Sequence, residues 1–78
     1  MKQEQLLQEL EYAFICDFIK TRKELHLTQQ ALADLSGVMR EKIAKIESNL
    51  NSPQLNSLIK VLAPIGYTVK IMPIDKEV

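Results

Sequence analysis

The chain has 78 residues, of which 46% are hydrophobic and 26% charged, the composition of one small folded domain. Ten lysines and arginines balance ten aspartates and glutamates, so a basic tail that coats nucleic acid is excluded, whereas a locally basic face is not. A single cysteine, a polar and acidic beginning and no apolar run of about 20 residues predict a cytoplasmic protein without a membrane segment. A core this small favours dimerisation.

Residues 3–25 are predicted to form one long helix, because their large apolar side chains recur mostly at steps of three, four or seven. These side chains are Leu6, Leu7, Leu10, Phe14, Phe18 and Leu25. The stretch YAFICDFI in the middle of the segment is apolar on more than one side, which predicts contacts with more than one neighbour. Within this stretch, we interpret Cys16 as a small core residue rather than a nucleophile.

Two short helices are predicted to follow. The first covers residues 29–35, with Thr28 as its N-cap and Gly37, which readily takes the left-handed conformation, at its end. The second covers residues 40–48 and is terminated by Asn49. The expected buried residues of the two helices are Leu32, Ala33, Leu35, Ile43 and Ile46.

A fourth helix is predicted to begin at Ser52 and Pro53, with the serine as cap and the proline at the first helical position. Pro64 and Gly66 are expected to close it. Its expected buried side chains are Leu55, Leu58, Ile59 and Leu62.

The last apolar segment has a different period. Tyr67, Val69 and Ile71 alternate with Thr68, Lys70 and Met72, which is the pattern of a β-strand. One strand cannot form a sheet alone, and the sequence contains no second strand candidate. We therefore expect this strand to pair with the same strand of another subunit across a dimer.

The segment TQQALADLSGVMREKIAKIE has the pattern of a helix-turn-helix, two short helices joined by a tight turn that contains glycine. A side chain at Gly37 would strain the backbone or press on the neighbouring helix, and Ala33 is small where the two helices cross. The apolar seam beneath the two helices has the spacing of the DNA-binding unit. It is formed by Leu32, Val38, Ile43 and Ile46. An ordinary helical hairpin in a small bundle would share these features.

The flanking residues extend the pattern. Over roughly Phe18 to Leu62 the sequence resembles the XRE family, the Cro/cI-like (lambda-repressor-like) DNA-binding domains, through TRKELHLTQQALADLSGV, IAKIES and NSPQLNSLIKVL. The resemblance implies a mainly α fold, a four- to five-helix lambda-repressor-like helix-turn-helix domain. We accordingly divide the chain into an extension of the first helix (1–17), the DNA-binding domain (18–66) and a C-terminal strand and tail (67–78).

The family pattern implies roles for individual residues. Arg22 and Glu47 would form a partly buried pair that ties the helices together. Gln29 would hydrogen-bond a DNA phosphate, helped by the positive end of its helix. The residues implied to contact DNA from the third helix and the loop after it are Met39, Arg40, Glu41, Lys42, Lys45, Asn49, Asn51 and Ser52.

These DNA contacts differ in kind. Arg40 suits guanine, Glu41 can accept a hydrogen bond from cytosine or reject other contacts, and the two lysines can reach a base or the backbone. The loop residues would contact phosphate, and the alternative for every residue of the group is a solvated surface. Two positions depart from the family: Met39 stands where Ser or Thr usually caps the helix, and His26 stands where Gly is usual. We expect a looser helix start, or a contact of Met39 with a thymine methyl, and a conformational cost at His26.

The tail SPQLNSLIKVLAPIGYTVKIMPID resembles the HigA-like or HipB-like antitoxins of type II toxin–antitoxin modules. This resemblance implies a homodimer, a palindromic operator through which the protein represses its own operon, and capture of a toxin, often a RelE/HigB-type ribonuclease. A stand-alone XRE-type or phage-type repressor is an alternative, as is a protein-interaction module without DNA binding. The apolar excess of the first helix would contact the dimer partner, the terminal strand, a toxin or the chain's own core; it comprises Leu7, Leu10, Phe14 and Ile15.

An enzyme would require a constellation of catalytic groups. The sequence has one histidine, His26, and its acidic residues lack the spacing of metal ligands. It also lacks a glycine-rich phosphate loop. We therefore expect no enzymatic activity, no cofactor and no metal.

Overall fold

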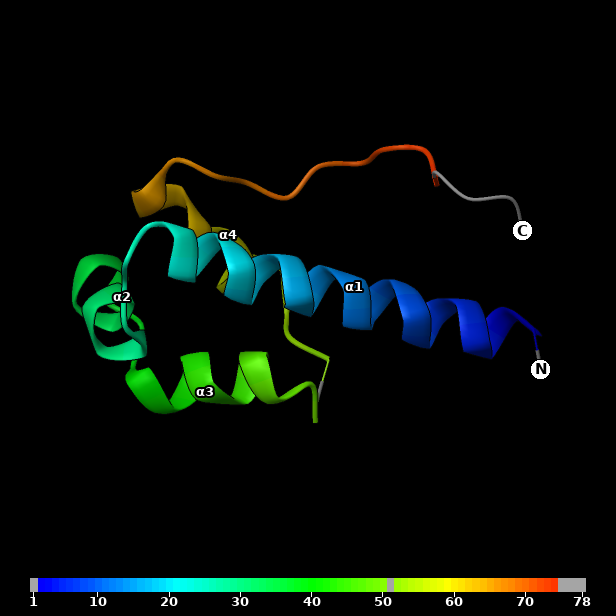
Figure 1. The fold of residues 1–78 in the computed structure, drawn as a ribbon, viewed down its shortest axis with the longest axis horizontal. Helices are drawn as coiled ribbons and strands as arrows, with labels where there is room; N and C mark the ends of the chain where they lie inside the picture. Colours follow the sequence, from blue (N-terminus) through cyan, green and yellow to red (C-terminus); the bar gives the residue numbers. More distant parts are fainter. Residues whose placement is uncertain (1, 51, 75–78) are drawn as a thin grey trace.

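The computed structural model describes residues 2–50 and 52–74, which contain four α-helices and one 3₁₀ helix. The elements are α1 (Lys2–Glu24), α2 (Gln29–Ser36), α3 (Arg40–Ser48), α4 (Leu55–Leu62) and η1 (Ala63–Ile65). The short helices gather around the C-terminal half of α1, while its N-terminal half projects beyond them (Figure 1). Helix α2 packs against α3 and α4, and α1 packs against α3.

The ends of α2 and α3 follow local sequence signals. The Thr28 side chain accepts a hydrogen bond from the N–H of Ala31 (3.0 Å), which caps α2 as expected. Gly37 ends α2 in the left-handed conformation (φ 74°), and Asn49 ends α3 in the same way (φ 59°). The predicted bounds of these helices are therefore right to within one residue.

The hydrophobic core lies where the four helices meet. It consists of Ile15, Phe18, Leu32, Ala33, Val38, Ile43, Ile46, Leu58, Val61 and Leu62. Leu32, Ile43 and Val61 are completely buried, and full burial of a side chain of this size contributes about 1.5–3 kcal/mol. The predicted seam beneath the helix-turn-helix is thus part of the core.

Helix α4 corrects two expectations. It begins at Leu55, two residues after Pro53, so its N-cap is Gln54 and not Ser52, whose hydroxyl donates to the Glu11 carboxylate (2.7 Å). The side chains it buries are Ser57, Leu58, Val61 and Leu62, whereas Leu55 and Ile59 are exposed. The buried face of α4 is rotated about the helix axis relative to the predicted one, because it includes Val61, three residues after Leu58.

The predicted C-terminal strand is wrong. Within the described residues no segment is a strand, and residues 67–74 run as a single extended segment back along α1 (Figure 1). The N–H of Tyr67 donates to the Leu62 carbonyl (3.0 Å), and Val69 packs against the core. Val69 is partly buried, whereas Ile71, two residues further along and on the same face of a regular strand, is fully exposed, so the alternating pattern does not produce a buried face. A strand also needs a second backbone to pair with, which the described chain does not supply.

Two further burial predictions are corrected. Leu35 of α2 is exposed, because the core side of that helix is already occupied by Leu32 and Ala33. Cys16 is exposed on α1, because the helix turns Ile15 and Phe18 toward the core and leaves the cysteine outside. Among residues 2–50 and 52–74, no helix combines the length and apolar character that crossing a bilayer requires.

Candidate nucleic-acid interface

The turn between α2 and α3 is built on Gly37. A Cβ atom added to this glycine would meet nothing within 4 Å, so crowding by a neighbouring helix is not the reason for glycine. The reason is the left-handed backbone conformation, which side chains with a Cβ resist. His26 takes the same conformation (φ 59°) in the turn between α1 and α2, as a non-glycine residue.

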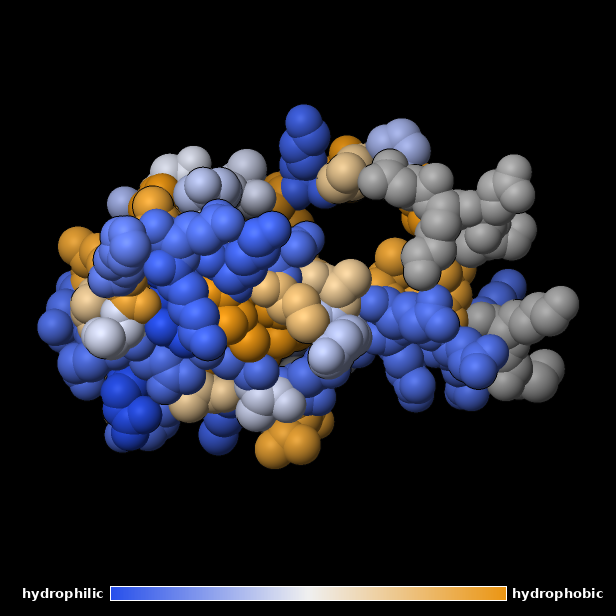
Figure 2. Space-filling view, in the orientation of Figure 1, coloured by the Kyte–Doolittle hydropathy of each residue, from blue (hydrophilic) through white to orange (hydrophobic). Residues whose placement is uncertain are grey.

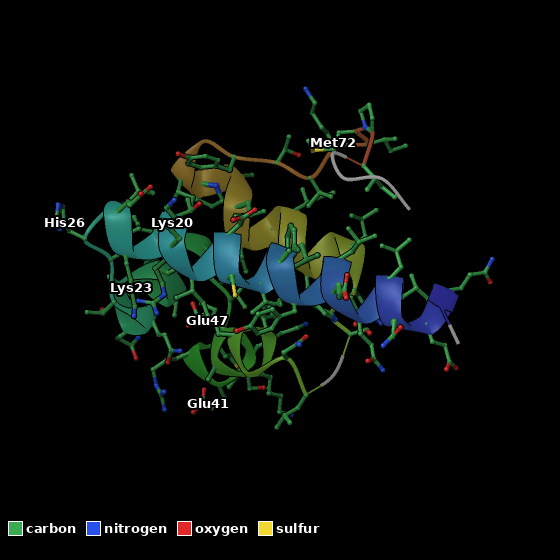
Figure 3. The ribbon with its side chains drawn as sticks, turned by 45° about the vertical axis from the view of Figure 1, so that its right-hand side comes forward. Lys20, Lys23, His26, Glu41, Glu47 and Met72 are labelled. Carbon is green, nitrogen blue, oxygen red and sulfur yellow. The ribbon has the colours of Figure 1, made fainter. Side chains whose placement is uncertain are left out.

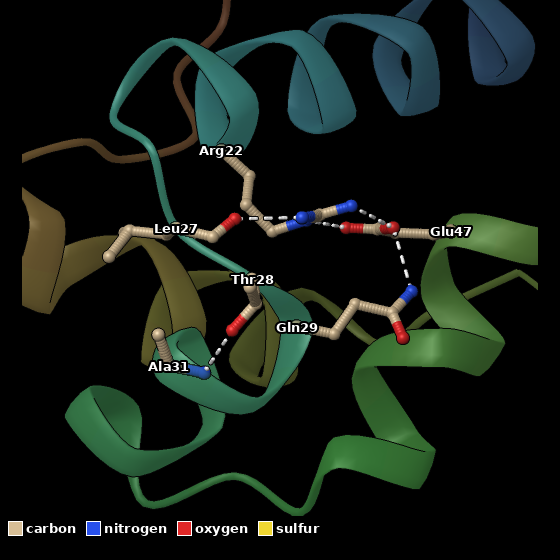
Figure 4. A network of polar contacts seen from close by, with 6 residues as sticks. All are labelled: Arg22, Leu27, Thr28, Gln29, Ala31 and Glu47. Atoms are coloured by element: carbon tan, nitrogen blue, oxygen red, sulfur yellow. Dashed lines mark hydrogen bonds and ion pairs between the residues drawn. The ribbon is translucent and has the colours of Figure 1, made fainter.

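A network of polar side chains holds α1, α2 and α3 together (Figure 4). Arg22 donates from Nε and Nη2 to the two carboxylate oxygens of Glu47, at 2.6 and 3.0 Å, and from Nη1 to the Leu27 carbonyl at 2.8 Å. The side chains of Arg22 and Glu47 are only 11% and 7% exposed. This bidentate pair fixes the end of α3 to α1, and a buried pair with its hydrogen bonds satisfied is rigid.

Gln29 also belongs to this network. Its side-chain nitrogen donates to the Glu47 carboxylate at 2.9 Å, so the amide links the start of α2 to the end of α3 (Figure 4). The residue is half-buried at the first position of α2, where the positive end of the helix lies. A phosphate contact of Gln29 stays a prediction, and the structure adds a second role that the sequence alone did not indicate.

The outer face of α3 carries the residues expected to read DNA. Ile43 and Ile46 face the core, whereas Arg40, Glu41, Lys42 and Lys45 are exposed. Figure 3 shows Glu41 on the outer side of α3 and Glu47 turned toward α1. The exposed charged residues of α3 thus comprise one acidic residue and three cations.

The start of α3 lacks the side-chain cap that a serine or threonine would supply. Met39 occupies the N-cap position in an extended conformation and makes no side-chain hydrogen bond to the helix. Its side chain is largely exposed. An apolar group is thus presented beside Arg40 at the end of the helix that enters the major groove in helix-turn-helix proteins.

A groove of about 300 Å³ lies between α3 and the start of α4. It is lined by Lys42, Lys45, Ile46, Ser52, Pro53, Gln54 and Ser57. Helix α4 begins here with Gln54 as N-cap and no side-chain hydrogen bond to the helix, so its positive end faces a groove that already holds two lysines. Such a site suits an anionic group.

The sequence located only some of the residues around the loop between α3 and α4. Asn49 lies at the end of α3 as its left-handed cap, Ser52 lines the groove beside Lys42, and Asn51 lies outside the described residues. Gln54 and Ser57 were missed because the fourth helix was expected to start two residues earlier. No local signal marks Gln54, because glutamine is not among the residues that N-cap positions prefer.

The seam, the glycine turn and the exposed third helix define a helix-turn-helix domain. A family model described as helix-turn-helix matches residues 19–71. The chain therefore belongs to the XRE-type helix-turn-helix family, which confirms the resemblance drawn from its sequence.

Two similar proteins add detail. An uncharacterised HTH-type transcriptional regulator of Haemophilus influenzae is 43% identical over 65 residues, which cover 83% of this chain and 66% of that protein. The chain thus spans slightly less than two thirds of the length of this relative. A chain of the structure described as a toxin–antitoxin module from Streptococcus pneumoniae superposes with a TM-score of 0.74 at 35% identity, over 95% of this chain and 82% of that one. Both the family and the regulator agree with the expectation that the chain is not an enzyme.

Proposed function

We propose that the protein is a sequence-specific DNA-binding transcriptional repressor that reads the major groove with α3. The observation that carries this proposal is the outer face of α3, where Arg40, Lys42 and Lys45 are exposed. The helix that presents them is held by the buried pair of Arg22 and Glu47. A rigid helix with exposed cations at its start is what direct reading of base edges requires.

The contacts are assigned by chemistry. Arg40 pairs bidentately with guanine, Glu41 accepts from cytosine, and Met39 touches a thymine methyl group. Backbone phosphates bind in the groove between α3 and α4, where Lys42, Lys45 and the uncapped start of α4 converge. Gln29, Asn49, Asn51 and Ser52 complete the contacts to the backbone.

The neutral net charge of the chain does not oppose DNA binding, because the charges are segregated. Residues 2–17 hold one lysine against four acidic residues, a net charge of −3. Residues 18–50 hold six lysines and arginines against four acidic residues, a net charge of +2. The positive excess lies in the C-terminal part of α1, because residues 28–50 hold three lysines and arginines against three acidic residues. Binding therefore depends on the exposed cations of α3 rather than on a net charge of the helix-turn-helix.

We further propose that the protein acts as a homodimer on a palindromic operator and represses its own operon. One α3 of nine residues reads a single half-site, so a specific operator requires two copies about 34 Å apart along the DNA. Likeness to a chain of a toxin–antitoxin module supports a role as the antitoxin, with a toxin such as a RelE/HigB-type ribonuclease as protein partner. The regulator-named relative supports the alternative, a stand-alone repressor.

The test is a fluorescence anisotropy titration of the full chain onto DNA from upstream of its own gene, at two salt concentrations, with scrambled DNA beside it. We expect specific, salt-sensitive binding at two chains per site. Arg40→Glu should lower the affinity for this DNA about tenfold or more, because one base contact is lost and a repulsion is added. Lys20→Glu is the matched control, since it changes the charge equally on an exposed residue of α1.

Three outcomes separate the candidate functions. Loss of binding in Arg40→Glu alone supports reading by α3. Equal loss in both variants indicates a general charge effect and contradicts the assigned role of Arg40. If the unaltered chain binds upstream and scrambled DNA equally weakly, the domain is better described as a protein-interaction module.

A further inference from the structure

An apolar groove of about 280 Å³ lies between α1, the loop that joins α3 to α4, and the beginning of the C-terminal tail. Its apolar lining is Leu7, Leu10, Phe14, Ile15, Pro53, Leu58 and Val69. At one end the groove is bordered by Asn49 and Ser52, which are also proposed to contact the DNA backbone. Figure 2 shows hydrophobic side chains open to solvent between the N-terminal half of α1 and the tail. We refer to this site as the α1–tail groove.

The α1–tail groove exposes apolar side chains that the helix-turn-helix core does not use. Ile15 and Leu58 at its base belong to the core, but the side chain of Leu7 is 63% exposed. Two further exposed apolar side chains, Ile71 and Met72, follow the lining residue Val69 in the tail. Clustered apolar surface on a small protein marks a place where another molecule binds.

The charge around the α1–tail groove selects the kind of occupant. Glu11 lines the groove, and Glu4, Leu7 and Glu11 share one face of α1 at spacings of three and four residues. The surrounding segment, residues 2–17, has a net charge of −3. Nucleic acid and an anionic lipid surface are therefore repelled. A second copy docked symmetrically would place two acidic rims against each other, which is also unfavourable.

We propose that the α1–tail groove is the docking site for a basic protein partner, whose apolar helix or extended segment is bordered by lysine or arginine. The apolar side chains of the partner would cover Leu7, Leu10 and Phe14, and its cations would face Glu4 and Glu11. The inference rests on the proposed function in taking the toxin as this partner. A protein that acts on RNA carries cations for its own substrate, which matches the acidic rim.

The probe is the protein encoded by the gene beside this one, co-expressed with the full chain and, once purified, titrated by calorimetry. Leu7→Asp should weaken the complex about tenfold or more, because a charge replaces an apolar contact near an acidic rim. Tyr12→Asp is the matched control: it adds the same charge to the same helix at a side chain that is also 63% exposed but does not line the groove. Glu11→Lys should weaken the complex and reduce its sensitivity to salt.

Each outcome has one meaning. Weakening by Leu7→Asp with binding intact in Tyr12→Asp supports the groove. Equal binding by the unaltered chain and Leu7→Asp overturns the groove while leaving the antitoxin role intact. No complex with the unaltered chain overturns both, and the operator titration then decides whether a stand-alone repressor remains. If Leu7→Asp instead abolishes a dimer in sedimentation, with partner binding unchanged, the occupant is a second copy and the proposal is wrong.

Discussion

The helix-turn-helix half of the molecule and the α1–tail half use their apolar residues in opposite ways. Around α2 and α3, Leu32 and Ile43 are completely buried, and the charged side chains beneath α3 are paired. Along the N-terminal half of α1 and the tail, Leu7 and Ile71 are exposed. The first region buries its large apolar side chains within the chain, whereas the second leaves such side chains exposed to solvent.

This difference teaches where the stability of the domain resides and where its partners bind. A buried contact contributes to folding in proportion to the apolar area that leaves water, so the helix-turn-helix half supplies most of the stability. Exposed apolar side chains contribute little to folding and gain most when a partner covers them. The following changes test that division, from the largest expected effect to the smallest.

The most direct test is the same substitution in both halves. Leu32→Ala, at a leucine with no exposed surface, should lower the free energy of unfolding by about 3 kcal/mol, because it removes buried methyl groups and leaves a cavity. Leu7→Ala should change it by no more than about 0.5 kcal/mol. Urea unfolding followed by circular dichroism measures both. Comparable losses in the two variants would show that the N-terminal half of α1 belongs to the folding core.

The next largest effect on stability is expected at the buried ion pair of Arg22 and Glu47. Arg22→Met should destabilise the fold by about 3 kcal/mol, because it leaves the largely buried Glu47 carboxylate without its cation. The double variant Arg22→Met/Glu47→Leu should recover much of that loss, since both buried charges are gone. Thermal unfolding of the two variants checks this. A double variant that is less stable than Arg22→Met would mean that Glu47 has a larger structural role than pairing, for instance through Gln29.

The smallest effects are expected at two of the left-handed positions, Gly37 and His26. Gly37→Ala should cost about 1 kcal/mol through backbone strain alone, because the space around a Cβ there is open. His26→Gly should stabilise the fold by about 0.5 kcal/mol, since glycine adopts this conformation without strain but is more flexible when unfolded. The midpoint of urea unfolding should therefore fall in Gly37→Ala and rise in His26→Gly. Destabilisation by His26→Gly would mean that the imidazole makes a contact worth more than the strain.

The candidate site was predictable where it depends on positions in the helix-turn-helix register. The family resemblance implied that the exposed side of α3 presents Arg40, Glu41, Lys42 and Lys45, and the structure exposes all four. The pairing of Gln29 with Glu47 was not predictable, because it joins residues on different helices whose distance depends on packing. Gln54 beside the two lysines escaped prediction because the fourth helix was expected to start two residues earlier.

The sequence by itself determined the local features of this protein. The Thr28 cap, the turn at Gly37 and the apolar seam act within a few residues, so their patterns predict α2, α3 and their turn directly. Only the tertiary structure decided that Cys16 is exposed, that Ser52 bonds Glu11 and that the tail remains a single extended segment. Those outcomes depend on which surfaces meet in three dimensions, because a strand, a cap or a buried face exists only when its partner is within reach.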